Sequence, residues 1–280
     1  MTGAPLRSLT ILGGRDKAGR PEVGEVTLRA GDVACIVGPT GSGKSRLLAD
    51  IECLAQGDTP SGRRILIDGA EPEPALRFAA HRKPVAQLSQ TMTFVVDLTV
   101  GEFVAMHARC RGVPDPGSRM PSIVAAVIAG ANDLSGEPFG PDDALAELSG
   151  GQSRALMIAD TALLSASPVV LIDEIENAGI DRRRALDLLV GEEKIVLIST
   201  HDPILALLGQ RRLVIRNGGI AEVIATGPDE RASLEVLARL DRALLDLRER
   251  LRAGRRIDHL PDWPALLGID KKRETTPWTP

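Results

Sequence analysis

The fold of this chain is decided by the stretch Val33-Ala34-Cys35-Ile36-Val37-Gly38-Pro39-Thr40-Gly41-Ser42-Gly43-Lys44-Ser45. Its first five residues are apolar, which is typical of a strand that is covered on both faces. Its last eight fit G-x-x-x-x-G-K-[ST], a loop whose backbone N–H groups and lysine hold the phosphates of a nucleoside triphosphate. The three glycines let the backbone approach those phosphates where a Cβ would collide. Because a helix is predicted over 44–54, the stretch has the strand–loop–helix context that a phosphate-binding loop requires.

Three later segments predict polar groups beside this loop. In Leu148-Ser149-Gly150-Gly151-Gln152, a helix is predicted to start at the serine and glycines, where unpaired N–H groups and the helix dipole attract anions. The apolar strand 169–172 runs into Asp173 and Glu174, and parallel strands bind ligands at this end. His201 follows a second apolar strand, 194–199, in the same way.

The rest of the chain alternates between predicted strands and helices. Residues 26–28 and 33–37 are expected to be strands joined by the turn 30–32. Residues 99–129 show a helical pattern that glycine and proline residues interrupt between 112 and 117. The remaining predictions are strands over 62–69, 85–89 and 212–216, and helices over 151–166 and 181–190. This alternation favours an α/β fold with a mainly parallel sheet and helices on both of its faces.

Taken together, the loop, the Leu148–Gln152 string and the Asp173-Glu174 pair resemble those of the ATP-binding cassette (ABC) ATPases, over roughly residues 5–225. The resemblance implies a P-loop NTPase fold with a small antiparallel β-subdomain and an inserted α-helical subdomain at about 91–165. It places the ATPase domain at 1–228 and leaves 229–280 as a helical extension with a proline-rich tail.

The resemblance also implies a role for each candidate residue, with ATP and Mg²⁺ as cofactors. The resemblance implies catalytic roles for Lys44, Glu174, His201 and Gln90, and Gln87 competes with Gln90 for its role. Glu174 would polarise the attacking water, and His201 would contact the γ-phosphate and orient Glu174. Mg²⁺ would be held by Ser45, Gln90 and Asp173. ATP would be bound by Gly38, Pro39, Thr40, Gly41, Ser42, Gly43, Lys44, Ser45, Ser149, Gly150, Gly151, Gln152 and Asp181. Residues 149–152 would face the γ-phosphate held by the opposite subunit, so two sites would form in a head-to-tail homodimer or with a paired ABC subunit.

Two features depart from the family pattern. The adenine-stacking aromatic ring, expected some 25–30 residues before Lys44, is missing, and Arg15 or Lys17 is left to cover the base. In addition, Asp181 lies eight residues after Asp173, where the family's D-loop aspartate commonly lies seven residues after its counterpart.

Charge and composition exclude several classes of protein. Residues 91–147 contain three Arg and eight Asp/Glu, which argues against a nucleic-acid interface in that segment. The 3 cysteines show no C-x-x-C spacing, and no run of 18 apolar residues occurs. With no secretory signal visible either, we expect a cytoplasmic protein that is peripheral to the membrane only through a partner.

Two functions are compatible with these motifs. The first is an ATPase subunit that energises a separate transmembrane permease, which the segment 98–103 within a full-length helical subdomain favours. The second is a soluble ABC ATPase that remodels a protein or metalloenzyme complex, for which the unusual residues 175–177 and the C-terminal extension leave room. In that extension, residues 229–253 form a predicted helix with an apolar stripe of leucines at 237, 240, 244, 247 and 251, expected either to pack on its own domain or to pair with a partner.

Overall fold

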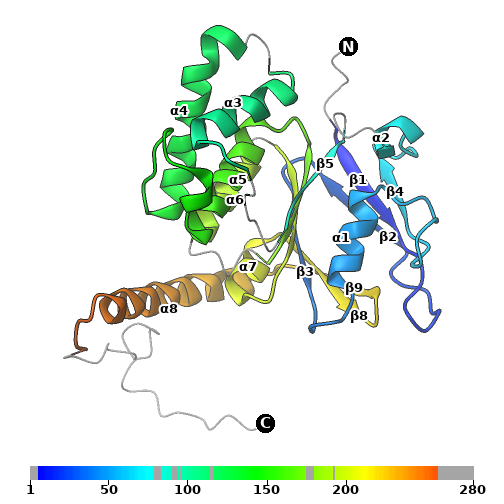
Figure 1. The fold of residues 1–280 in the computed structure, drawn as a ribbon. Helices are drawn as coiled ribbons and strands as arrows, with labels where there is room; N and C mark the ends of the chain where they lie inside the picture. Colours follow the sequence, from blue (N-terminus) through cyan, green and yellow to red (C-terminus); the bar gives the residue numbers. More distant parts are fainter. Residues whose placement is uncertain are drawn as a thin grey trace, which may run out of the picture. The chain divides into compact units, whose positions relative to one another are not determined.

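The computed structural model describes residues 6–78, 83–89, 94, 96–113, 116–174, 180–191 and 193–257. The chain divides into two compact units, Met1–Ala225 and Thr226–Pro280. All the predicted site residues belong to the first unit. Figure 1 shows the path of the chain through its helices and strands.

A six-stranded sheet forms the centre of the first unit. Its order is β5-β6-β7-β3-β8-β9, and the first five of these strands are parallel, whereas β9 pairs antiparallel with β8. The strands are β5 (Val85–Leu88), β6 (Val169–Asp173), β7 (Ile195–Ser199), β3 (Val33–Val37), β8 (Arg211–Arg216) and β9 (Gly219–Ala225). The predicted mainly parallel sheet is therefore confirmed.

A second, three-stranded sheet is antiparallel, as the predicted β-subdomain requires. Its order is β2-β1-β4, formed by β2 (Glu25–Arg29), β1 (Ser8–Leu12) and β4 (Arg64–Ile67). The turn after β2 is held by Asp32, whose carboxylate accepts from the Arg29 N–H at 3.0 Å. This turn does not make a hairpin within one sheet, because β2 lies in the antiparallel sheet and β3 in the parallel one.

Both faces of the parallel sheet are covered by packed side chains. Along β6, Val170 and Ile172 face one hydrophobic cluster, while Val169 and Leu171 face the other, as the two-residue repeat of a strand dictates. The first cluster includes α5 (Gly150–Leu164) and α6 (Arg182–Val190), and the second includes α1 (Lys44–Glu52) with the antiparallel sheet (Figure 1). Burial on both faces explains why these strands read as continuous apolar runs.

The helical subdomain consists of α3 (Val100–Cys110), α4 (Pro116–Ser135) and α5, with the 3-10 turn η2 (Leu145–Glu147) before α5. Helices α3 and α5 start with the same device, a capping box in which Thr99 pairs with Glu102 and Ser149 pairs with Gln152. The remaining helices are α2 (Pro74–Phe78), α7 (Pro203–Leu208) and, in the second unit, α8 (Pro228–Arg252). Among the described residues, no helix combines the length and the apolar character needed to cross a membrane.

Candidate active site

The phosphate-binding loop lies between β3 and α1, as predicted, and two of its glycines are required by close backbone contacts. A Cβ on Gly38 would come within 2.5 Å of the Ile215 carbonyl oxygen. A Cβ on Gly43, whose φ is +109°, would come within 2.7 Å of the Gly218 Cα. Ser42 accepts a 2.6 Å hydrogen bond at its carbonyl from the Gly218 N–H. The turn between β8 and β9 therefore packs directly against the loop and fixes its shape.

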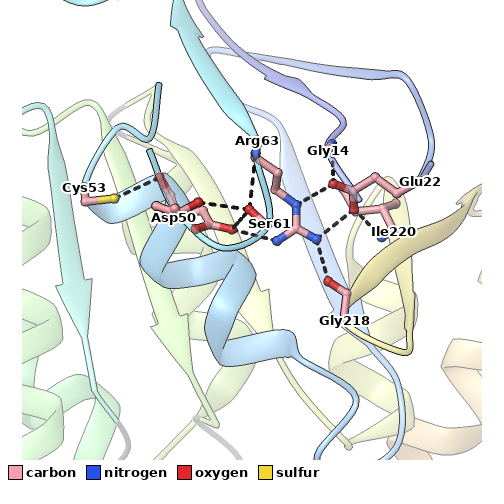
Figure 2. Close-up of polar contacts among 9 residues, drawn as sticks. Gly14, Glu22, Asp50, Cys53, Ser61, Arg63, Gly218 and Ile220 are labelled. Atoms are coloured by element: carbon pink, nitrogen blue, oxygen red, sulfur yellow. Dashed lines mark hydrogen bonds and ion pairs between the residues drawn. The ribbon is translucent and has the colours of Figure 1, made fainter. Parts of the chain in front are cut away.

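That turn is held in place by a buried arginine (Figure 2). The Arg63 side chain is fully buried and donates to both carboxylate oxygens of Glu22 at 2.7 Å, to Asp50 at 2.7 Å and to the Gly218 carbonyl at 2.8 Å. Burial alone would lower the pKa of Arg63, but the two carboxylates outweigh burial and raise it. Glu22 additionally accepts from the Ile220 N–H at 2.6 Å. One guanidinium thus joins the connection between β1 and β2, helix α1 and the β8–β9 turn.

Three of the predicted catalytic side chains meet at the C-terminal end of the parallel sheet. Lys44 is buried, and its Nζ lies 2.9 Å from the Gly38 carbonyl oxygen and 2.9 Å from the Nε2 of His201. The same His201 nitrogen lies 3.6 Å from Oε1 of Glu174. Lysine, histidine and carboxylate therefore form a continuous polar row beside the phosphate loop.

The backbone of Glu174 adopts an uncommon conformation, with a φ of +51°. Its N–H donates to the Ser199 carbonyl at 2.9 Å, at the end of the neighbouring strand β7. Its carbonyl accepts from Arg154 at 3.2 Å, a buried residue of α5. These bonds hold Glu174 in a geometry that a bulky residue rarely adopts on its own. Arg154 was missed in the sequence, although its place five residues after Ser149 on the same predicted helix was visible.

The predicted Mg²⁺ ligands can be placed in part. Ser45 is the second residue of α1 and is exposed, and Asp173 ends β6, opposite Ser199 in the register of β6 and β7. A hydroxyl and a carboxylate are hard oxygen ligands of the kind that Mg²⁺ prefers. Gln90 lies outside the described residues, so its predicted role stays a prediction.

The predicted anion-binding segment forms the first turn of α5. Ser149 accepts from the Gln152 N–H at 3.2 Å, and the Gln152 side chain accepts from the Ser149 N–H at 2.8 Å. Both side chains also reach Glu137, at 3.5 Å and 3.4 Å. At Gly150, no described atom lies within 4 Å of the place a Cβ would take. The segment is therefore ordered by its own cap and leaves open space at its glycine.

Asp181 caps helix α6, where its carboxylate accepts from the N–H groups of Arg183 and Arg184 at 3.1 Å. Its neighbour Arg182 forms an ion pair with Asp202, the residue after His201. Asp202 in turn caps α7 by accepting from the Ile204 and Leu205 N–H groups. The sequence did not reveal the Arg182–Asp202 pair, because its partners lie on different predicted elements.

Comparison with known proteins identifies the family. The family model for ABC transporters matches residues 24–177. The chain is 52% identical over 255 residues to the uncharacterized ABC transporter ATP-binding protein MJ0121 of Methanocaldococcus jannaschii, over 91% of this chain and 96% of that protein. The chain belongs to the ABC transporter family. The resemblance to ABC ATPases that the sequence motifs indicated is thus confirmed.

More distant relatives of this ABC ATPase have transport-related names. It is 31% identical over 210 residues to the molybdenum import ATP-binding protein ModC of Mycobacterium tuberculosis, over 71% of this chain and 55% of that protein. It is 30% identical over 243 residues to the macrolide export ATP-binding/permease protein MacB 1/2 of Paracoccus denitrificans, over 81% of this chain and 34% of that protein. The chain therefore spans about half of one relative and a third of the other.

Solved structures share the fold of this ABC ATPase. The dimeric post-hydrolysis state of the ATP-binding cassette MJ0796, bound to ADP and Pi, matches with a TM-score of 0.58 and 22% identity, over 78% of this chain and 99% of that chain. The cbiO1 protein of Clostridium perfringens, part of the cbiONQ transporter complex, also gives a TM-score of 0.58, with 20% identity over 88% of this chain and 99% of that chain. The predicted α/β P-loop fold is confirmed by both.

Proposed function

We propose that this ABC ATPase binds ATP with Mg²⁺, hydrolyses it at the interface of a head-to-tail dimer, and thereby energises a separate membrane transporter subunit. The observation that supports hydrolysis most directly is the row of Lys44, His201 and Glu174, with contacts of 2.9 Å and 3.6 Å, beside the phosphate loop. These groups come from α1, the end of β7 and the end of β6, so the fold itself assembles them.

Nucleotide binding would change the contacts of Lys44. Its ammonium now donates to the carbonyl oxygens of Gly38 and Pro39, at 2.9 and 3.4 Å, and contacts His201. Phosphate oxygens are stronger partners for an ammonium than backbone carbonyls, because the hydrogen bond is charge-assisted on both sides. ATP would therefore draw Lys44 toward its β- and γ-phosphates and leave His201 available to the γ-phosphate and to Glu174.

Hydrolysis requires a water molecule to attack the γ-phosphorus while the bond to the leaving ADP breaks, which yields ADP and inorganic phosphate. The Glu174 carboxylate would polarise that water and accept its proton. His201 would orient the carboxylate from the 3.6 Å position that it already occupies. Ser45 and Asp173 would hold Mg²⁺, together with Gln90. When bound, Mg²⁺ neutralises the charge that develops on the phosphate oxygens.

The dimer part of the proposal rests on the first turn of α5. Its Ser149 and Gln152 side chains are ordered by their own cap and by Glu137, and the space at Gly150 is open. A helix N-terminus of this kind binds anions through its N–H groups and dipole. The γ-phosphate of ATP held by a second subunit is the anion we propose for it, with Asp181, which caps α6, contributing to the same interface.

Two variants test hydrolysis, with a matched control. Glu174→Gln should retain ATP affinity and lose turnover by about 10²–10⁴-fold, since it removes a general base. Lys44→Ala should weaken ATP binding itself. Glu222→Gln makes the same chemical change at an exposed residue of β9 and should leave both unchanged. Unaltered turnover in Glu174→Gln, measured as phosphate release, would remove Glu174 from the mechanism.

The partner is tested by purifying the tagged protein from membranes and from soluble extract of its native host. A transmembrane permease recovered with it would support the transporter function, which the names of the relatives ModC and MacB favour. Recovery only with a soluble protein or metalloenzyme complex would support the alternative and overturn the transporter proposal.

A further inference from the structure

A second lysine reaches the phosphate loop from outside it. Lys17 lies in the connection between β1 and β2, and its Nζ donates to the Gly41 carbonyl in the middle of the loop, at 3.2 Å. Its stem lies over Gly218, where a Cβ would come within 2.9 Å of the Lys17 Cγ. In the described part of the chain, this carbonyl is the one hydrogen-bond partner of the Lys17 ammonium. The side chain is exposed, so its remaining donors face solvent beside the loop.

The backbone around Lys17 is fixed by neighbouring turns. The Lys17 N–H donates to the Asn217 carbonyl at 2.8 Å, and the Asn217 amide donates to Asp16 at 3.1 Å. Asp16 also accepts from the N–H groups of Ala18 and Arg20, at 2.8 and 2.9 Å. The Arg20 N–H and the Asn217 amide lower the pKa of Asp16, so this carboxylate stays ionised at neutral pH and keeps the turn closed. Lys17 is thus held at the loop by its own backbone.

The two other cations of this turn point elsewhere or lack such a contact. Arg15 donates to the Gly19 carbonyl at 2.9 Å, within the same turn. Arg20 is exposed, and its described hydrogen bonds come from its backbone. Of the two residues that the sequence left open for covering the base, the structure therefore places Lys17, and not Arg15, at the loop.

No aromatic ring occurs in the three segments that meet here, residues 13–24, 38–45 and 216–219. The first ring in the chain is Phe78, on α2. Its neighbour Arg77 donates to the Cys53 carbonyl, at the opposite end of α1 from the loop. Helix α1 is nine residues long, which separates its ends by about 13 Å. Phe78 therefore provides no stacking surface near the loop.

We propose that Lys17 is a second phosphate-binding cation of the nucleotide site, and that this site selects its ligand by the polyphosphate and hardly by the base. This inference rests on the proposed ATP-binding function. An ammonium that now donates to a carbonyl of the phosphate loop gains a charge-assisted partner when an anionic polyphosphate binds there. A purine, by contrast, meets no aromatic ring from residues 13–24, 38–45 or 216–219.

The test is calorimetric titration of the full chain with the Mg²⁺ salts of ATP, GTP and inorganic tripolyphosphate. For the wild type we expect ATP and GTP dissociation constants within about threefold of each other. Lys17→Ala should raise the dissociation constants of all three ligands by the same factor, about 5- to 20-fold for the loss of an exposed charged hydrogen bond. Lys17→Arg keeps the charge and should retain most of the affinity. Arg20→Ala removes the same charge from the same turn and should change affinity less than twofold.

Several results would overturn the inference while leaving ATP binding intact. These are equal affinities in Lys17→Ala and Arg20→Ala, a loss in Lys17→Ala for ATP but not for tripolyphosphate, or a wild type that binds ATP far more tightly than GTP. A wild type that binds none of the three ligands would instead refute the proposed function, and this inference with it.

Discussion

Replacing Arg63 by methionine is expected to lower the free energy of unfolding by about 3–5 kcal/mol, because it leaves buried carboxylates without their counter-charge. The Arg63 guanidinium is fully buried and makes 2.7 Å contacts with Glu22 and with Asp50. Methionine fills a similar volume but donates no hydrogen bond. Glu22 keeps the N–H groups of Gly14 and Ile220, and Asp50 keeps the Ser61 hydroxyl, so the carboxylates retain some partners. Against a typical total stability of about 5–15 kcal/mol, the loss is large.

Urea unfolding at pH 7 without nucleotide, followed by circular dichroism, measures this loss. The matched control is the adjacent Arg64→Met, since the Arg64 and Glu71 side chains that pair there are 48% and 59% exposed. That change should cost at most about 1 kcal/mol. Adding Glu22→Gln to Arg63→Met should recover part of the loss, because one unpaired charge disappears. Equal unfolding midpoints for Arg63→Met and Arg64→Met would refute the reasoning.

Four further predictions concern the active site, two of the cysteines and the C-terminal helix. Ser149→Arg should leave ATP binding to the monomer intact but abolish dimerisation and turnover; full activity of this variant in a phosphate-release assay would show that the site is not shared between subunits. Arg154→Leu should lower kcat with little change in ATP affinity, since it frees the Glu174 carbonyl; a loss of affinity alone, measured by calorimetry, would contradict a positioning role. Cys110 is exposed and should alkylate rapidly at pH 8, whereas burial raises the pKa of Cys35 to about 12, so its thiolate fraction is about 10⁻⁴ and its labelling, followed by mass spectrometry, should await unfolding. Truncation at Gly227 should preserve ATP binding but weaken dimer or partner association in sedimentation; unchanged association would assign the C-terminal helix a packing role only.

The parts of the site that could be predicted are those whose signals are local. The phosphate loop, Asp173 and His201 each follow an apolar strand within a few residues, and a parallel sheet brings such strand ends to one edge. The contact of His201 with Lys44 follows from that rule. The contacts of Arg63, and the contact that distinguishes Lys17 from Arg15, could not be predicted, because their partners lie far along the chain, up to 155 residues away for Arg63 and Gly218.

The assignment of strands to sheets was not predicted, although the sequence held a signal for it. Residues 26–28 and 33–37 were predicted only as strands joined by a short turn, and the structure places β2 and β3 in different sheets. Their burial differs: in β2 two buried residues alternate with exposed or half-buried ones, whereas β3 is buried at four successive positions. Alternation is typical of a sheet with one solvent-exposed face, and continuous burial is typical of a sheet covered on both faces. In the sequence, the polar residues Glu25, Thr27 and Arg29 at every second position already indicate this difference from the apolar run 33–37.

The position of strand β3 in the sheet has a consequence for synthesis of the chain at the ribosome, because β3 must wait for both of its neighbouring strands. Its two neighbours in the sheet are β7 and β8, and β7 begins at Ile195. At a translation rate of about 5–20 residues per second, the roughly 160 residues in between take about 8–30 s to emerge. During that time the apolar segment Val33–Val37 has neither of its hydrogen-bonded neighbours. Nascent chains of this length therefore leave the apolar segment of β3 without its sheet neighbours, and a circular permutation that places β7 before β3 would shorten that exposure.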